Sequence, residues 1–83
     1  MNMLSLELGQ IKALFALKQQ SRSRQRLSSD LRCKLTPLDR QINLLVNNNL
    51  VKDVDDTISL TTEGEAFVEQ LRGEMKRLAF LMV

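Results

Sequence analysis

With 83 residues, the chain is long enough for one small domain and too short for an enzyme with a separate cofactor-binding domain. It has no His and a single cysteine, Cys33, which excludes the commonest general base, a cysteine-based zinc site and an intrachain disulfide. Its three glycines are scattered and form no phosphate-binding loop. We therefore expect no enzymatic activity, no cofactor and no metal.

The net charge is only +2, but it is distributed unevenly. Residues 1–40 hold eight Lys and Arg against three acids, whereas residues 41–83 hold four against seven. A one-sided basic surface suits nucleic acid, because affinity comes largely from neutralising phosphates. The alternative is an ordinary solvated surface.

Neither a leader nor a membrane segment is indicated. The first eight residues include Glu7 where a signal peptide would be basic, and no apolar run approaches the roughly 18 residues of a membrane span. We therefore expect a cytoplasmic protein without a membrane partner. A reduced Cys33 is compatible with that compartment.

The first two predicted elements are helices. Apolar residues recur every three to four positions near the N-terminus, at Leu4, Leu8, Ile11 and Phe15, and predict a helix within residues 1–18. The polar segment 19–26 is a break, where Ser21 and Ser23 compete for backbone hydrogen bonds. A short helix over residues 25–32 follows, with Leu27 and Leu31 one turn apart.

The third helix has the clearest start signal. Thr36 suits an N-cap and Pro37 the first helical position. Leu38, Ile42 and Leu45 lie on one face of a helix that we expect to run from Pro37 to about Asn48. It ends in an Asn run, and Asn tolerates the left-handed conformation found at helix ends.

A hairpin and a last helix complete the chain. Two apolar segments, 50–54 and 57–60, flank the tight turn Asp55-Asp56 and predict a two-stranded wing. The acids of this turn, Asp53 included, are better explained by a solvated hairpin than by a metal site. Thr62 and Glu65 have the spacing of a capping box that opens the last helix.

The order of these elements is that of a winged helix-turn-helix, in which the third helix enters the major groove. The fold class is mainly α with a small β-hairpin. We expect one domain over residues 1–83: an N-terminal helix (1–18), a helix-turn-helix (24–49), a wing (50–61) and a C-terminal dimerisation helix (62–83).

The stretch from Leu27 to Phe67 resembles the small winged-helix regulators of the MarR and PadR type. The resemblance is carried by the apolar face of the third helix, by Asn49-Leu50-Val51 leading into the wing, and by Leu60-Thr61 with Gly64 closing it. It implies a DNA-binding transcriptional regulator. The three Asp of the wing depart from the Arg or Lys usual there. Residues 10–18 also resemble the winged-helix protein of bacterial ferrous-iron transport, the FeoC-like family, but its wing cysteines are missing, so no iron–sulfur role carries over.

We interpret the polar positions of the third helix as base contacts, because Arg pairs with guanine and Asn or Gln with adenine. These candidates are Asp39, Arg40, Gln41, Asn43 and Asn47. The alternative is a solvated helix face, with the Asn run serving as a helix end. The cations around the second helix are candidates for phosphate contacts, which fix position without reading sequence; they are Arg22, Arg24, Arg26, Arg32 and Lys34.

The two outer helices predict a homodimer, because so small a core cannot cover both apolar stripes. The stripes comprise Leu4, Leu8, Ile11 and Phe15 in the first helix and Phe67, Leu71, Met75, Leu78 and Met82 in the last. The alternative is that the two helices pack on each other within one chain.

Two further alternatives stay open. The scaffold could serve as a protein–protein interaction adaptor that does not bind DNA, with a partner docking on the acidic wing or the apolar residues 78–83. Cys33, between Arg32 and Lys34, is either a small half-buried residue or a redox sensor.

Overall fold

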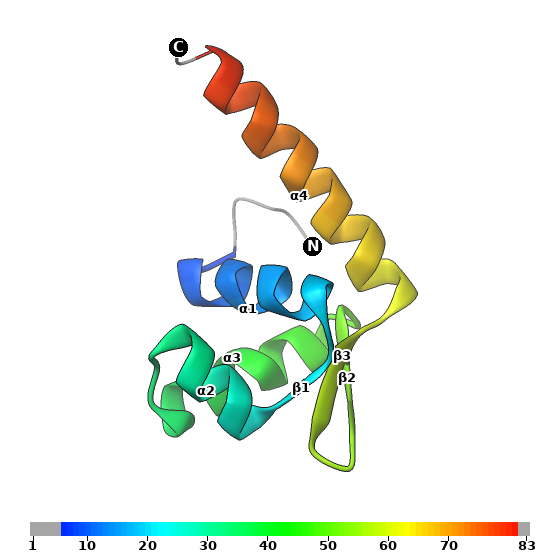
Figure 1. Cartoon of the computed structure of the whole chain (residues 1–83). Helices are drawn as coiled ribbons and strands as arrows, with labels where there is room; N and C mark the ends of the chain where they lie inside the picture. Colours follow the sequence, from blue (N-terminus) through cyan, green and yellow to red (C-terminus); the bar gives the residue numbers. More distant parts are fainter. Residues whose placement is uncertain (1–5, 82–83) are drawn as a thin grey trace.

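The structure, a computed structural model, describes residues 6–81 and the side chains of residues 6–79. The mainly helical architecture and the predicted order of the four helices and the hairpin are confirmed (Figure 1). In chain order the elements are α1 (Leu8–Gln19), β1 (Arg22–Ser23), α2 (Arg24–Leu31), α3 (Leu35–Asn47), β2 (Val51–Val54), β3 (Thr57–Leu60) and α4 (Thr62–Leu81). This is a winged helix-turn-helix, with α2 and α3 as the two-helix unit and the β2–β3 hairpin as the wing.

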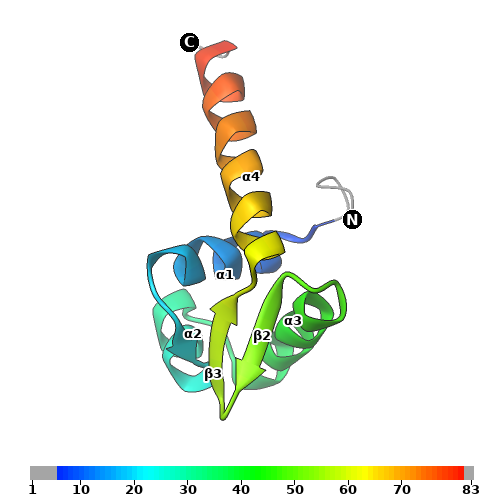
Figure 2. The ribbon, with the colours of Figure 1, turned by 90° about the vertical axis from the view of Figure 1, so that its right-hand side faces the viewer.

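One apolar core joins these elements. Helices α1, α2 and α3 form a bundle, and the sheet lies along one side of it (Figure 2). The core contains three residues of α1, one of α2, three of α3, three around the sheet and two of α4. In that order they are Ala13, Leu14 and Leu17; Leu27; Leu38, Ile42 and Leu45; Leu50, Val51 and Ile58; and Val68 and Leu71. The predicted buried face of the third helix is thus confirmed.

The sheet has one strand more than predicted. The hairpin is present, and Asp55 and Asp56 form its turn with φ angles of 51° and 64°. However, β1 pairs antiparallel with β3, so the strand order is β1-β3-β2. The expectation of a two-stranded wing flanked by a plain break was wrong at β1, because two residues are too few to show an alternating pattern.

Two predicted helix starts are displaced. Lys34, not Thr36, precedes α3, so Pro37 occupies the third helical position. Proline is tolerated there because first-turn amides have no partner within the helix. At α4 the cap is Thr61 instead of Thr62: its Oγ1 accepts a hydrogen bond from the Gly64 amide at 2.9 Å. At α4 the adjacent Thr61 and Thr62 carry the same signal, whereas at α3 the actual cap, Lys34, makes no side-chain capping hydrogen bond.

The buried face of α1 is distinct from the apolar stripe that was assigned to dimerisation. The helix begins at Leu8, and its most deeply buried apolar residues are Ala13, Leu14 and Leu17. Leu8 is 66% exposed, while Ile11 and Phe15 are half-buried. The helix is apolar on nearly every side, so its periodicity could not single out the core face.

Helix α4 rests on the body by its first half only. Leu71 belongs to the core, and Lys18 of α1 forms an ion pair with Glu69, with 3.0 Å between Nζ and Oε1. Beyond this point the helix extends away from the bundle (Figures 1 and 2). No helix within residues 6–81 is both long and apolar enough to cross a membrane.

Candidate nucleic-acid interface

The turn between α2 and α3 holds the two helices of the unit in place. Arg32 adopts the left-handed conformation, with φ 53°, and its amide donates to the carbonyls of Ser28 and Ser29. The Ser28 hydroxyl also donates to the carbonyl of Cys33. Arg32 thus occupies the conformation that glycine usually provides at a helix end. The side chains of Arg32 and Lys34 are both solvent-exposed.

Helix α3 presents a polar face directly opposite its buried one. Successive residues turn by about 100° around the axis, so Arg40, Asn43 and Asn47 share a stripe on the side away from Leu38, Ile42 and Leu45. All three side chains of this stripe are exposed, whereas the three leucine and isoleucine side chains are at most 2% exposed. We call the exposed stripe the α3 outer face.

Thr36 and Leu44 share the α3 outer face and were not among the predicted site residues. Both are exposed, Leu44 to 39%. Projecting the sequence on a helical wheel would have found them, because they lie four residues from Arg40 on either side. Their methyl groups are suited to apolar contact with a thymine methyl.

Asp39 and Gln41 lie on opposite flanks of α3, off its outer face. Asp39 is turned toward α2, where its Oδ1 accepts from Arg24 at 3.0 Å. Gln41 is turned toward α1, where its Nε2 donates to Glu7 Oε2 at 2.6 Å. Three of the five predicted base-contact residues therefore lie together, and these two are engaged within the chain.

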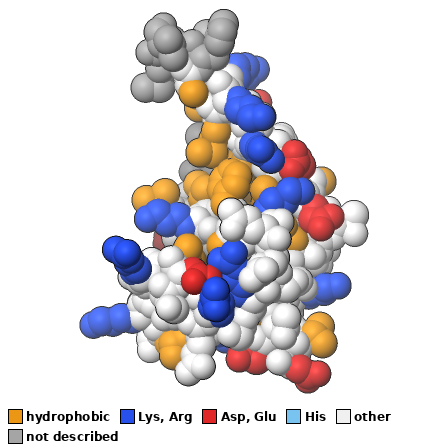
Figure 3. All heavy atoms as spheres, in the orientation of Figure 1, with side chains coloured by type: hydrophobic (Ala, Val, Ile, Leu, Met, Phe, Trp, Pro, Cys, Tyr) orange, Lys and Arg blue, Asp and Glu red, His pale blue; other side chains and the backbone are white. Residues whose placement is uncertain are grey.

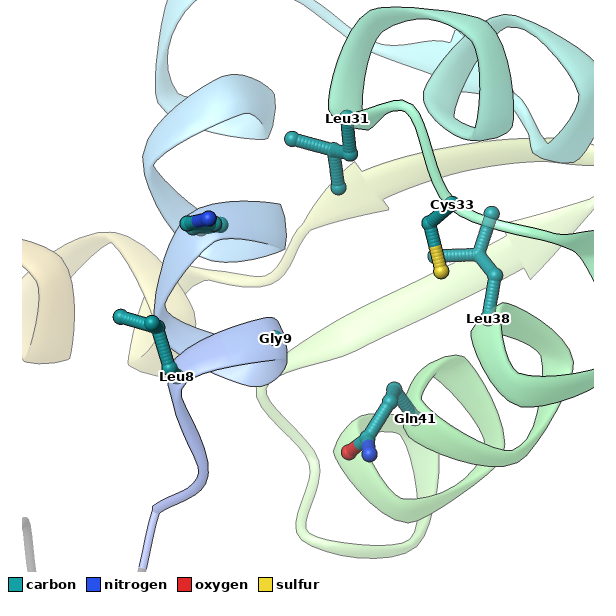
Figure 4. A pocket seen from close by; sticks show the side chains of 7 residues that line it. Leu8, Gly9, Leu31, Cys33, Leu38 and Gln41 are labelled. Atoms are coloured by element: carbon teal, nitrogen blue, oxygen red, sulfur yellow. The ribbon is translucent and has the colours of Figure 1, made fainter.

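Gln41 also lines a hollow of about 200 Å³ between α1, the end of α2 and α3 (Figure 4). Its walls are largely apolar and are formed by Leu8, Gly9, Lys12, Leu31, Cys33, Leu38 and Gln41. Cys33 is half-buried, in agreement with the expectation of a small half-buried residue. Its Sγ lies 3.4 Å from the Lys34 carbonyl oxygen.

Two of the predicted phosphate-binding cations share one carboxylate. Arg22 Nη1 lies 2.7 Å from Asp30 Oδ2, and Arg26 Nε lies 3.3 Å from the same oxygen. The Arg22 side chain is only 12% exposed, whereas that of Arg26 is 67% exposed. Arg26 is accessible to a phosphate, and Arg22 is largely held against the body of the protein.

Arg24 is the most heavily engaged cation of the described chain. Its three kinds of guanidinium nitrogen each face a different carboxylate: Nη2 lies 2.7 Å from Asp53, Nη1 3.0 Å from Asp39, and Nε 3.6 Å from Asp56. The hydrogen bond with Asp53 raises the pKa of Arg24, partial burial opposes this, and Asp39 adds to the rise. Arg24 is therefore always charged.

The distribution of charge on the surface follows from these ion pairs. In the view of Figure 3, acidic side chains lie at the lower edge of the molecule and also along its right-hand side, and Lys and Arg are spread over the bundle and along α4. The described residues thus show separate basic patches. Arg32 and Lys34 at the turn, Arg26 on α2 and Arg40 on α3 are all exposed.

The predicted dimerisation residues divide into two sets. Leu71 is buried, and Phe15 and Phe67 pack against the core within the same chain. Leu8, Met75 and Leu78 are 66%, 52% and 55% exposed. The expected alternative, packing within one chain, thus describes the base of α4 and leaves its outer half uncovered. Leu4 and Met82 lie outside the described residues.

No family model matches this chain, and no curated protein is significantly similar to it in sequence. Solved structures do match. The reduced form of MarR from E. coli has a TM-score of 0.77 and 29% identity, over 81% of this chain and 52% of that one. A MarR/EmrR family transcriptional regulator from Acinetobacter sp. ADP1 has a TM-score of 0.82 and 20% identity, over 95% of this chain and 60% of that one.

A third match is BpsR from Bordetella bronchiseptica, a protein whose DNA binding is regulated by 6-hydroxynicotinic acid. It has a TM-score of 0.81 and 20% identity, over 90% of this chain and 58% of that one. This chain therefore spans between 52% and 60% of these three structures. It has a MarR-like winged-helix fold, which confirms the resemblance noted in the sequence.

Proposed function

We propose that the chain is a sequence-specific regulator of transcription that binds double-stranded DNA with α3 in the major groove. The observation that carries this proposal is the α3 outer face. Arg40, Asn43 and Asn47 stand exposed on one stripe, opposite a face that anchors the helix in the core. Arg can bond guanine O6 and N7, and Asn can bond adenine N6 and N7. The MarR-like fold of the chain supports the same function.

Phosphate contacts would come from the cations beside this helix. Arg32 and Lys34 lie at the turn that precedes α3, and Arg26 lies on α2, all with exposed side chains. Such contacts fix the position of the protein on the duplex and supply affinity for any sequence. Arg22 would contribute less, because Asp30 and Gln19 already bond its guanidinium.

A homodimer completes the proposal. The outer half of α4 exposes Met75 and Leu78, and a second copy would cover them across a two-fold axis. Such a dimer places two copies of α3 on half-sites about 34 Å apart, one turn of DNA. The chain requires neither a cofactor nor a catalytic group for this function.

Selection from a random duplex pool tests the proposal. The bound sequences should converge on one motif with two related halves, and binding to that motif should weaken steeply as salt rises. A pool that stays random while binding persists would make the chain a nonspecific DNA binder. Absence of binding to any duplex at low salt would exclude the proposed function.

The second candidate function is a protein–protein adaptor. The exposed Met75 and Leu78 favour it as much as they favour a dimer, and the wing carries an excess of carboxylates. For an adaptor, the mobility of DNA fragments should be unchanged by the protein at every salt concentration.

A further inference from the structure

Arg24 joins three parts of the molecule that are distant in sequence. It is the first residue of α2, Asp39 lies in the first half of α3, Asp53 lies on β2 and Asp56 lies in the wing turn. The Arg24 side chain is 21% exposed, and those of Asp39 and Asp53 are 47% and 30% exposed. The wing and the proposed DNA-reading helix are thus both tied to one guanidinium.

The backbone presents Arg24 to these carboxylates. Ser23 of β1 pairs with Thr57 of β3, and Val54 of β2 pairs with the same Thr57. Arg24 directly follows Ser23, so it begins α2 beside the end of the hairpin. Ser23 also caps α2, because its Oγ accepts from the Arg26 amide at 3.1 Å. The short strand β1 therefore fixes where the guanidinium lies.

This arrangement is poorly suited to a phosphate contact. Each kind of guanidinium nitrogen already faces a carboxylate, and a DNA phosphate would have to displace at least one of them. Three carboxylates on one guanidinium also leave a surplus of two negative charges beside α3. Without Arg24 those carboxylates would repel both one another and an approaching phosphate.

We propose that Arg24 is a positioning residue for DNA binding: it holds the wing against α3 and offsets one of the three negative charges beside the DNA-binding surface, without itself contacting DNA. This inference rests on the proposed function. It assigns two of the three wing acids, Asp53 and Asp56, to an internal contact with Arg24 beside the adjacent helix.

A set of four variants tests the inference on a duplex selected by the wild-type chain. Arg24→Ala should weaken binding on the order of tenfold at low salt, because like charges then face the phosphates. Arg24→Lys should bind DNA nearly as weakly as Arg24→Ala, since an ammonium group is a point charge and cannot bond three carboxylates as the planar guanidinium does. Arg24→Ala combined with Asp39→Asn and Asp53→Asn should recover most of the affinity. Asp39→Asn with Asp53→Asn alone should bind at least as tightly as the wild type.

A phosphate contact by Arg24 would give the opposite pattern. Arg24→Lys would retain most of the affinity, and removing the two carboxylates would not compensate for the loss of Arg24. That result, or an unchanged affinity of Arg24→Ala, would overturn the inference. Arg26→Ala is the matched control: the Asp39 and Asp53 substitutions should change its affinity no more than they change that of the wild type, because Arg26 bonds neither carboxylate.

Amide hydrogen exchange provides a measurement that needs no DNA. In Arg24→Ala the amides of β2 and β3 should exchange several-fold faster than in the wild type, while those of α1 should keep their rates. Equal exchange in the hairpin would show that Arg24 does not hold the wing. If the wild type bound no duplex, the proposed function would fail, and this measurement would still decide whether Arg24 holds the wing in place.

Discussion

The carbonyl oxygen of Leu50 lies where a side chain on Gly64 would have to be. A Cβ on Gly64 would stand 1.9 Å from that oxygen and 2.9 Å from the Leu50 carbonyl carbon. The same oxygen accepts a hydrogen bond from the Thr61 amide at 3.1 Å. Thr61 in turn donates its hydroxyl to the Asn49 carbonyl at 2.7 Å and caps α4. The entry to the wing and the start of α4 are therefore packed backbone to backbone.

Gly64→Ala should destabilise the protein strongly. The added methyl meets main-chain atoms, which cannot rotate aside, so α4 or the β2–β3 wing must shift. We expect the free energy of unfolding to fall by about 3 kcal/mol, at the upper end for overpacking of a core. Urea denaturation followed by circular dichroism measures this change.

Gly73→Ala is the control for that substitution. Gly73 lies in the same helix, and a Cβ there has no neighbouring atom within 4 Å among the described residues. Alanine is favoured over glycine in a helix by about 1 kcal/mol, so this variant should gain stability. Two Gly→Ala changes in one helix should thus have opposite signs. A loss at both positions would contradict the close approach at Gly64.

Arg32→Gly should separate stability from DNA binding. Glycine adopts the left-handed conformation of residue 32 without strain, so the free energy of unfolding should rise by up to about 1 kcal/mol. The same change removes a proposed phosphate contact and should lower DNA affinity on all sequences. Thermal unfolding and a salt series of binding measurements report the two effects. Unchanged DNA affinity would remove Arg32 from the interface.

Arg40→Ala should reduce sequence discrimination. If Arg40 bonds a guanine, its loss costs about 1–3 kcal/mol at the selected site and little on unrelated DNA. Arg26→Ala should instead weaken binding to both duplexes and lower the salt slope by about one contact. Competition experiments with the two duplexes distinguish these outcomes. An equal loss on both for Arg40→Ala would make Arg40 a phosphate contact.

Leu78→Asp should dissociate the proposed dimer without unfolding the domain, since Leu78 is 55% exposed and lies beyond the core. Sedimentation at micromolar concentration should give about 19 kDa for the wild type, twice the 9.5 kDa of the chain, and about 9.5 kDa for the variant. A wild-type monomer that still binds DNA tightly would contradict the dimer.

Lys18→Ala should raise the pKa of Glu69 back toward its ordinary value. In the wild type the hydrogen bond and charge of Lys18 lower that pKa, with smaller contributions from Arg72 and Lys76. The pairing therefore stabilises the fold above the ordinary carboxyl pKa and is lost as pH falls through the lowered one. Carbon-13 NMR titration of the Glu69 carboxyl measures the change, and Lys12→Ala, which has no ion pair with Glu69, should leave it unaltered.

The elements with long or repeated signals could be predicted from the sequence. Leu38, Ile42 and Leu45 gave the right core face of α3, because the opposite positions are polar. The paired Asp of the turn predicted the hairpin, since such residues tolerate positive φ. In α1 the periodicity did not indicate that Ala13, Leu14 and Leu17 would form the core face, because apolar residues surround that helix.

The details of the candidate site depended on contacts between distant residues. Nothing near Arg24 in the sequence indicates that Asp39, Asp53 and Asp56 will surround it, since those pairings exist only after β1 joins β3. Gln41 and Asn43 are both polar residues of α3, and only packing against α1 separates the one that bonds Glu7 from the one on the α3 outer face. Long-range packing therefore decided which polar side chains remain accessible.

Because α4 is one continuous helix, the side chains of its outer half keep a fixed orientation about the helix axis relative to the bundle. Each residue of a helix advances about 1.5 Å along the axis and turns about 100°, so any insertion in the outer half both displaces and rotates the residues beyond it. One extra residue after Gly73 would turn Leu78 by more than a quarter circle relative to α3. Seven extra residues, close to two full turns, would bring it back to nearly the same side but about 10 Å farther out. The number of residues in the outer half of α4 would thus set the orientation of a partner bound at Leu78, and only insertions of nearly whole turns would preserve that orientation.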